Sequence, residues 1–389
     1  MRKGRDFMYT NNDEQRIMQR TAREFAEREI APALKAQMEK GQPYDFCLGI
    51  WPKVAEAGFV GISTTEEMGG LGLGVTTELL VMEAFTYYGG GPVATNIDAH
   101  NLALRTLEFN GSDYLKEKYG EKGATGEIVF AAAITDPAGS MNFPEWSITV
   151  THDGDYDIIN GTKFFTTNMI AADVYAIYVN DYENGYPMGC YFIDKDTEGF
   201  EIGNRESFGT SGTNTGTITL KNVRVPKENK IPSADLANAE WLALGYLDAA
   251  AIFSARTRKV LDLTEAYVKQ RTRNGKPMAS MQAVAHRMAN MNMLYEQARS
   301  IMYTAARLWD EGRPDLKLHS MAKIATSDAF STISHDCTVL HGAYGSAPEN
   351  GIIQFHISAP ASQCGECPND FHRDLIAKYM GIELDTHLA

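Results

Sequence analysis

The stretches TDPAGS (135–140) and NGTKFFTTN (160–168) are the most informative part of this 389-residue sequence. The first follows the apolar run IVFAAAIT and offers a hydroxyl, a proline turn, a glycine and a second hydroxyl. The second begins with Asn-Gly, a hairpin-turn dipeptide, and continues with aromatic residues and threonines. A loop of the first kind can lay backbone N–H groups and hydroxyls along the edge of a flat, oxygen-rich ring. Either motif alone is typical of an ordinary turn, but together they predict a shared site.

The sequence around these motifs has the pattern of short strands. Apolar or alternating runs such as VYAIYV, GCYFIDK and TITLKNVRVP are separated by Asp-Gly, Asn-Gly and Glu-Asn-Gly turns. This pattern is typical of antiparallel β-structure.

Helical periodicity lies on both sides of the strands. The first amphipathic helix is expected over 11–40, with Asn11 as its N-cap. Four long helical segments follow the strands, at about 236–272, 279–311, 317–342 and 368–381, which is the length range of a four-helix bundle. We therefore predict an α+β fold in three domains: an all-helical N-terminal domain (1–127), a central antiparallel β domain (128–234) and a C-terminal four-helix bundle (235–389).

Composition excludes several classes of protein. A formal net charge of −14, from 36 basic and 50 acidic residues, argues against a nucleic-acid surface. No apolar run reaches the roughly 18–20 residues that a membrane span needs. Five cysteines are too few and too unevenly placed for a secreted disulfide framework. The expectation is a cytoplasmic protein that contacts neither membrane nor nucleic acid.

The two opening motifs resemble the T-E-P-x-A-G-S and N-G-x-K-x-[FW]-I-T-N signatures of the acyl-CoA dehydrogenase family. With WPKVAEAGFVGI and TEEMGGLGL, the resemblance covers about residues 13–382. It implies an FAD cofactor. By the same resemblance, Thr135 and Ser140 should contact the flavin or the thioester, Phe165 should pack on the isoalloxazine, and Thr167 should hydrogen-bond its central edge.

The chain departs from the first signature in three ways. It lacks one residue between Pro137 and Ala138, it has Asp136 in place of glutamate, and it has Met141 in place of aspartate.

The segment 267–291 resembles the family's Y-x-x-x-R-x-x-F-G-x-P-x-x-x-x-Q pattern, with Arg271 and Gln282 at the matching positions and Asn274 in place of phenylalanine. A guanidinium can donate two parallel hydrogen bonds to a pyrophosphate. The resemblance implies that Arg271 and Gln282 bind the cofactor, with Arg271 reaching the FAD of a neighbouring subunit. Taken singly, Arg271 also fits a solvated helix residue.

The C-terminal part departs furthest from the family. Val339 and Ala343 replace the glutamine and a glycine of the usual Q-x-x-G-G, which touches the adenosine end of FAD. Alignment back from FHRDLIAKYMG, through Arg373, places Glu366 on the catalytic base. The alternative base position of some relatives falls near Tyr246, which has no carboxylate.

Chemistry gives a glutamate at this position a role. Removal of the α-proton of a thioester needs a carboxylate over Cα while the β-hydride leaves to flavin N5. A partly buried glutamate is expected to have a raised pKa, nearer that of the activated α-proton.

Other titratable groups have weaker cases. Cys364 and Cys367 flank Glu366, but no second pair of ligands accompanies them, so no metal site is expected. Asp98 lies where the family lines its acyl pocket, and is either a substrate-binding residue that favours a polar or unusual acyl group or a solvated loop aspartate.

The expected function is FAD-dependent α,β-dehydrogenation of an acyl-CoA thioester, with Glu366 as base. The resemblance implies FAD between the β domain and the bundle, an electron-transferring flavoprotein as electron acceptor, and a homotetramer or homodimer. Two alternatives remain open. One is enoyl-CoA reduction or a non-oxidative thioester elimination on the same scaffold, and the other is a non-catalytic scaffold subunit of a heteromeric complex.

Overall fold

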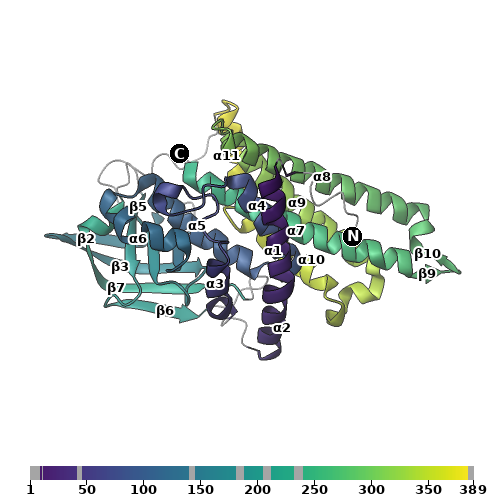
Figure 1. Cartoon of the computed structure of the whole chain (residues 1–389), viewed down its shortest axis with the longest axis horizontal. Coiled ribbons are helices and arrows are strands. Elements are labelled where there is room, and N and C mark those ends of the chain that lie inside the picture. The colour runs from purple at the N-terminus through teal and green to yellow at the C-terminus, as the bar shows by residue number, and fades with distance from the viewer. Residues whose placement is uncertain are drawn as a thin grey trace. The chain divides into compact units, whose positions relative to one another are not determined.

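The computed structural model describes residues 9–10, 12–41, 46–139, 145–180, 188–204, 212–231 and 240–383. Helices, then strands, then helices follow one another along the chain (Figure 1), which confirms the predicted α+β fold class. The chain forms two compact units. One comprises Met1–Ala26, Leu79–Gly91 and Tyr246–Asp385, and the other comprises Glu27–Glu78, Pro92–Gly245 and Thr386–Ala389. Within the described residues, none of the helices has the combined length and apolar character needed to cross a bilayer.

The N-terminal helical segment is less regular than its sequence pattern suggests. Helix α1 (Asp13–Phe25) and helix α2 (Ala31–Glu39) are joined by a π-helical turn (Ala26–Ile30), so the helix predicted over 11–40 is present from 13 to 39 but is not α-helical throughout. Pro32, in the first turn of α2, has no N–H to donate, which favours a change of hydrogen-bonding register before it. The N-cap is Asn12, whose Oδ1 accepts from Gln15 N at 2.8 Å, whereas Asn11 lies outside the described residues.

Four further helices complete the part of the chain that precedes the strands. They are α3 (Phe46–Glu56), α4 (Val75–Gly89), α5 (Pro92–Asn110) and α6 (Asp113–Thr125).

Strands β1 to β8 form two four-stranded sheets, and the short strands β9 (Thr272–Arg273) and β10 (Lys276–Pro277) form a separate two-stranded sheet (Figure 1). One has the order β2-β3-β7-β6 and is antiparallel throughout. The other has the order β1-β4-β5-β8, and its β1–β4 pair is parallel, unlike its remaining pairs. The long connection through β2 and β3 that separates β1 from β4 in the chain permits the parallel pairing. The strands are β1 (Phe130–Ala133), β2 (Thr149–Asp153), β3 (Tyr156–Thr166), β4 (Val174–Asn180), β5 (Met188–Asp194), β6 (Phe200–Asn204), β7 (Gly216–Pro226) and β8 (Lys230–Ile231).

The compact unit that contains these sheets has a core where α5 and α6 pack against β1. The ring of Phe130 on β1 stacks on that of His100 on α5 with centroids 5.1 Å apart, and meets Phe192 on β5 edge-on at 5.9 Å. Helix α6 approaches closely because residue 123 is glycine: a Cβ there would lie 2.4 Å from the Phe130 ring.

His100 is held as a neutral imidazole. Its Nδ1 accepts from Phe130 N at 3.0 Å, and its Nε2 donates to Gly123 O at 2.9 Å, so only one tautomer satisfies both bonds. The side chain is fully buried, and burial lowers the pKa of His100 to about 4.

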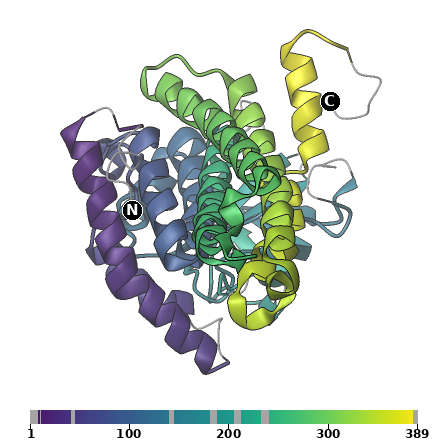
Figure 2. The same cartoon turned by 90° about the vertical axis from the view of Figure 1, so that its right-hand side faces the viewer.

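The C-terminal part of the chain contains one more helix than predicted. Three long helices are followed by the shorter α10 and α11, and α10 occupies sequence that was not predicted to be helical. Pro360 predicts a helix end, whereas α10 continues to Cys364. Figure 2 views these helices from the side of the hairpin that joins α7 to α8. Their bounds are α7 (Glu240–Gln270), α8 (Gln282–Asp310), α9 (Leu316–His341), α10 (Ile352–Cys364) and α11 (Asn369–Tyr379).

A buried core and a buried polar cluster hold these helices together. The apolar core includes Leu261 of α7, Tyr295 of α8, Ile333 of α9 and Ile352 of α10. The polar cluster centres on Glu83 of α4, whose carboxylate accepts from Ser254 Oγ on α7 and from Arg299 Nε and Tyr303 Oη on α8, at 2.7, 2.9 and 2.7 Å. A buried carboxylate with this many donors fixes α4 against two helices of its unit.

The neutral state of His100 predicts a loss of stability in acid. Its folded pKa of about 4 is below the ordinary 6.5, so between these pH values the unfolded chain binds a proton that the folded chain excludes. We expect the free energy of unfolding to fall as pH falls from 6.5 to 4, by up to about 1.4 kcal/mol per pH unit from this group, and the urea midpoint to fall with it. His372 contributes in the same sense, because burial lowers its pKa to about 4 as well.

The variant His100→Gln should therefore lose less stability between pH 7 and pH 4.5 than the wild type, measured as the difference in urea midpoint. His286→Gln, which removes an exposed histidine on α8, is the matched control and should leave that difference unchanged. If the urea midpoint falls equally in the wild type and in His100→Gln between pH 7 and pH 4.5, the assignment of His100 as a neutral imidazole in the folded chain is wrong.

Candidate active site

Glu366 lies in a short, sharply bent loop between α10 and α11. Its φ is 49° and that of the next residue, Cys367, is 70°, so two successive residues with side chains adopt the left-handed conformation. That conformation costs roughly 1–2 kcal/mol per residue outside glycine. A loop of this shape persists only where its surroundings hold it.

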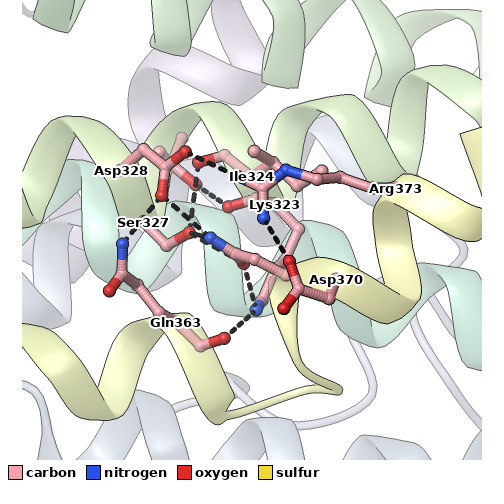
Figure 3. A network of polar contacts seen from close by, with 9 residues as sticks. Lys323, Ile324, Ser327, Asp328, Gln363, Asp370 and Arg373 are labelled. Carbon is pink, nitrogen blue, oxygen red and sulfur yellow. Dashed lines mark hydrogen bonds and ion pairs between the residues drawn. The ribbon is translucent and has the colours of Figure 1, made fainter.

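The first of these surroundings is Lys323, a fully buried residue of α9. Its Nζ donates to Cys367 O at 2.7 Å, to Asn369 Oδ1 at 2.7 Å and to Gln363 O at 3.4 Å (Figure 3). Burial lowers the pKa of Lys323 to about 8, against the opposing influence of Cys367 and Glu366. One amine thus binds both ends of the loop.

The second is His372 of α11, which is also fully buried. Its Nε2 donates to Glu366 O at 2.8 Å, and its Nδ1 lies 3.3 Å from Ser320 Oγ. Because its pKa is lowered to about 4 by burial, His372 is neutral near pH 7. The carbonyls of Glu366 and Cys367 are therefore both held by buried donors.

Tyr246 of α7 reaches the same loop. Its ring meets His372 edge-on with centroids 4.5 Å apart, and its hydroxyl donates to the Cys367 thiol. Burial raises the pKa of Tyr246 well above its usual range and that of Cys367 to about 12. Near pH 7 the hydroxyl and the thiol are therefore protonated, and Glu366 brings the carboxyl group to this cluster.

A network of polar contacts continues from the loop along α9 (Figure 3). Asp328 Oδ1 accepts from Gln363 Nε2 at 2.8 Å and from Asn369 Nδ2 at 2.9 Å. Arg373 of α11 lies 3.3 Å from Asp328 Oδ2 and 2.8 Å from Asp370 Oδ1. The residues on both sides of Glu366 are thus attached to one rigid helix.

The other compact unit brings the two opening motifs together. Phe164 N donates to Thr135 O at 2.8 Å, so TDPAGS pairs directly with NGTKFFTTN. Phe165 has a φ of 53° and leaves 52% of its surface exposed, which is unusual for a large aromatic residue beside a sheet. Thr167 Oγ1 lies 3.1 Å from Thr215 Oγ1. Ser140 lies outside the described residues.

Asp136 organises the turn of the first motif. It is buried, and its carboxylate accepts from Ala138 N at 3.1 Å, from Ser147 N and Oγ at 3.0 Å, and from Ile148 N at 3.2 Å. Burial favours a raised pKa, but the hydrogen bonds from Ser147 and Ala138 outweigh it and hold the pKa of Asp136 below its usual value.

Lys163 of β3 completes this arrangement. Its buried Nζ donates to Ile134 O at 2.8 Å and lies 3.8 Å from Asp136 Oδ2 and 3.6 Å from the centre of the Trp146 ring. Burial lowers the pKa of Lys163 to about 7. The aspartate that replaces the usual glutamate is thus an anchor for the loop and not a free acid.

With this geometry described, comparison with known proteins assigns the chain. Models of the acyl-CoA dehydrogenase N-terminal, middle and C-terminal domains match residues 12–127, 131–223 and 240–381. The chain belongs to the acyl-CoA dehydrogenase family. It is a flavin oxidoreductase, and the members of its family bind FAD.

Three relatives illustrate the range of this family. An acyl-CoA dehydrogenase of Bacillus subtilis is 30% identical over 94% of this chain and 98% of its own length. Subunit CarC of the caffeyl-CoA reductase-Etf complex of Acetobacterium woodii is 30% identical over 89% of this chain and 92% of its own. A solved glutaryl-coenzyme A dehydrogenase in its glutaryl-CoA complex has a TM-score of 0.87, with 28% identity over 96% of each chain.

Arg271 and Gln282, expected at the cofactor of this acyl-CoA dehydrogenase homologue, flank an exposed hairpin. Arg271 follows the last residue of α7, Gln282 is the first residue of α8, and both side chains are exposed. Between them, Asn274 and Gly275 have φ values of 51° and 74°. These values suit a type I′ turn, which explains why asparagine takes the place of the family's phenylalanine.

The altered adenosine-contact positions are also exposed. Val339, near the end of α9, leaves 49% of its surface accessible, and Ala343 in the following turn is exposed too. The ring of Tyr344 lies 5.9 Å from the Arg271 guanidinium. Neither altered position therefore has a packing role inside the unit.

Asp98 has different surroundings from those of a loop residue. It lies within α5 and only 7% of its surface is exposed, so the alternative of a solvated loop aspartate is wrong. A helical, buried aspartate keeps the interpretation as a pocket residue open.

No metal centre emerges from the part of the chain that the structure describes, in which no three His, Cys, Asp or Glu residues form a possible metal site. Cys364 is exposed and Cys367 is half-buried, and both are free thiols.

Two site residues, Lys163 and Lys323, were not predicted from the sequence. The feature that could have identified Lys163 is its position in a strand whose side chains alternate between the two faces of the sheet, since Lys163 falls on the inward-facing side. The signal for Lys323 was a lone lysine among the small and apolar residues of SMAKIA, on the buried face of a helix. In both cases a charge at a core position indicates a buried network.

Removal of the Asp136 carboxylate tests the anchor. Asp136→Ala leaves four donors and a buried ammonium without their acceptor, so we expect a loss of roughly 3 kcal/mol or more in the free energy of unfolding. Asp136→Asn keeps part of the acceptor set and should lose less. Urea midpoints at pH 7 measure both. Asp153→Asn, at an exposed aspartate of β2, is the control and should change stability by less than about 0.5 kcal/mol. If the urea midpoint of Asp136→Ala equals that of the control, the Asp136 carboxylate does not anchor the turn.

Proposed function

We propose that this protein catalyses the α,β-dehydrogenation of an acyl-CoA thioester, with Glu366 as the base that removes the α-proton. The observation that supports this proposal is the loop at 365–368, which contains Glu366 and whose strained backbone is held by hydrogen bonds from the buried side chains of Lys323 and His372. Strain of this kind is typical of catalytic positions.

The residues of the two motifs fit an FAD. Phe165 offers an exposed aromatic face, Thr135 and Thr167 offer hydroxyls nearby on paired segments, and the Asp136–Lys163 anchor fixes the turn that carries Thr135. We propose that these residues, with Ser140, hold the flavin, and that Arg271 and Gln282 hold its pyrophosphate and adenosine portion from a neighbouring subunit. When bound, FAD supplies a hydride acceptor at N5.

The residues around Glu366 suit removal of a weakly acidic proton. Tyr246 and Cys367 are protonated near pH 7. The ring of His372 is a weak base with a pKa of about 4, and its two nitrogens face Glu366 O and Ser320 Oγ, so none of these three neighbours competes with Glu366 as a base. The Glu366 side chain is half-buried, which limits the water that would otherwise solvate the carboxylate. Asp98 is proposed to line the acyl pocket.

Organisation and partners are part of the proposal. The three family matches fall within the proposed domains 1–127, 128–234 and 235–389, which supports that division. We propose a homotetramer or homodimer, because Arg271 is expected to serve a neighbouring subunit. An electron-transferring flavoprotein is the proposed electron acceptor, and the relative CarC is named as a subunit of an Etf complex.

Enoyl-CoA reduction is the second candidate. Two relatives are named as reductases, caffeyl-CoA reductase and 3-(aryl)acrylate reductase, at 30% and 29% identity. The same base and cofactor serve the reverse reaction, with Glu366 then returning the α-proton. Whether the enzyme oxidises an acyl-CoA or reduces an enoyl-CoA is decided by the substrate and the redox partner and not by the loop that carries Glu366.

Flavin bleaching tests the proposal. The purified protein should be yellow, and a panel of short linear, branched, aromatic and alicyclic acyl-CoAs should include one that bleaches the flavin absorbance. Glu366→Gln should retain the flavin and slow the bleaching by at least about 10²-fold, since a positioned general base contributes roughly 10²–10⁴-fold.

Each outcome has a distinct meaning. A colourless protein that cannot be reconstituted with FAD would contradict the flavin site and favour the scaffold alternative. Near-normal bleaching in Glu366→Gln would show that another group is the base. Oxidation of the reduced flavin by an enoyl-CoA, with no bleaching by any saturated acyl-CoA, would favour the reductase.

A further inference from the structure

The ammonium group of Lys323 has three N–H donors, and three acceptor oxygens of other residues lie around it. An ammonium carries three N–H groups, and Nζ lies within hydrogen-bond distance of the carbonyls of Gln363 and Cys367 and of Asn369 Oδ1. These acceptors come from the end of α10, from the loop and from the start of α11, so they bracket Glu366 on both sides.

We propose that Lys323 is a positioning residue for the reaction: it fixes the backbone that carries Glu366, and with it the place of the carboxylate. This inference rests on the proposed role of Glu366 as base. Lys323 itself contacts the backbone of the loop and not a reacting atom, so it acts through the loop.

The conformation of the loop explains why such an anchor is needed. Glu366 and Cys367 both have positive φ. In this conformation a residue with a side chain is strained, whereas glycine is not. The bond from Nζ to Cys367 O, 2.7 Å long, is attached to the carbonyl of that strained residue and opposes its relaxation.

A purely structural role would be met more cheaply by an apolar side chain. Burial of an ammonium among helices costs several kcal/mol before its hydrogen bonds are counted. Helix α9 already packs on α10 and α11, and its buried residues include apolar ones such as Ala322 and Phe330. The charged residue is therefore better explained by the specific acceptors it holds than by packing.

The charge of Lys323 links the anchor to pH. Burial lowers its pKa to about 8. Above that pH the neutral amine has only two N–H groups for three acceptors. The anchor should therefore weaken as pH rises through about 8. The titratable or charged groups that face Lys323 are Asp328 of α9, Cys364 at the end of α10, Glu366 and Cys367 of the loop, and His372 of α11.

The test measures the rate of α-proton removal separately from hydride transfer. A 3-thia-acyl-CoA has sulfur at the β-position and therefore no β-hydride, but its α-proton still exchanges with solvent deuterium when a base removes it. The flavin-loaded enzyme is saturated with this ligand in deuterium oxide, and exchange is followed by mass spectrometry. Binding is measured separately as the Kd of the same ligand.

Lys323→Met should slow exchange by at least about tenfold, while Kd changes less than threefold and the flavin content stays that of the wild type. Lys323→Gln keeps a donor without the charge and should give an intermediate rate. Lys317→Met, in the first turn of the same helix, removes a half-buried lysine and is the matched control with normal exchange. In the wild type the exchange rate should fall as pH rises through about 8, and this alkaline fall should be absent in Lys323→Gln.

Other outcomes overturn the proposal. Normal exchange in Lys323→Met does so, and so does a parallel loss of exchange, ligand binding and flavin content, which indicates a structural role. If Lys323→Met does not fold, Lys323→Gln decides: an unchanged rate or a persistent alkaline fall sinks the inference. Glu366→Gln is measured alongside, and normal exchange in that variant refutes the base instead, independently of Lys323.

Discussion

The buried amine of Lys323 supports the part of this protein that differs most from its relatives. The loop at 365–368 contains two left-handed residues with side chains, and its carbonyls accept from Lys323 and His372. Neither donor is accessible to water, so the bonds are not exchanged for solvent. Removal of either donor would take from a loop carbonyl the buried donor that holds it, so both side chains oppose relaxation of the strained backbone.

The same device recurs in the other compact unit. Lys163 is also a buried lysine, it donates to a backbone carbonyl of Ile134, and it lies beside Asp136, which binds four donors of the adjoining turn. Each candidate site segment is thus built on a lysine that is hidden from solvent and does not itself meet the substrate. Burial lowers the pKa of both amines, to about 7 for Lys163 and about 8 for Lys323.

The departures from the family motifs are local and have physical explanations in most cases. Asp136 is shorter than the usual glutamate but lies within a loop that is one residue shorter, and it is fully engaged. Asn274 occupies a tight turn that suits asparagine. Cys367 adopts the left-handed conformation, and its thiol accepts from Tyr246. Nothing in the structure explains why Val339 and Ala343 replace the residues usual at the adenosine end.

The order of helices and strands, the α+β class and the meeting of TDPAGS with NGTKFFTTN were all predictable from the sequence, because turn dipeptides and apolar periodicity act over short distances. The π-helical turn, α10 and the parallel β1–β4 pair were not, since each depends on contacts between distant segments. Alignment pointed to Glu366, but only the tertiary structure brought Lys323, Tyr246 and His372 to its loop. The partners of Lys323 and Tyr246 in the loop lie tens of residues or more away in the chain. Burial, which decides the protonation of all three side chains, is a property of the packed fold alone.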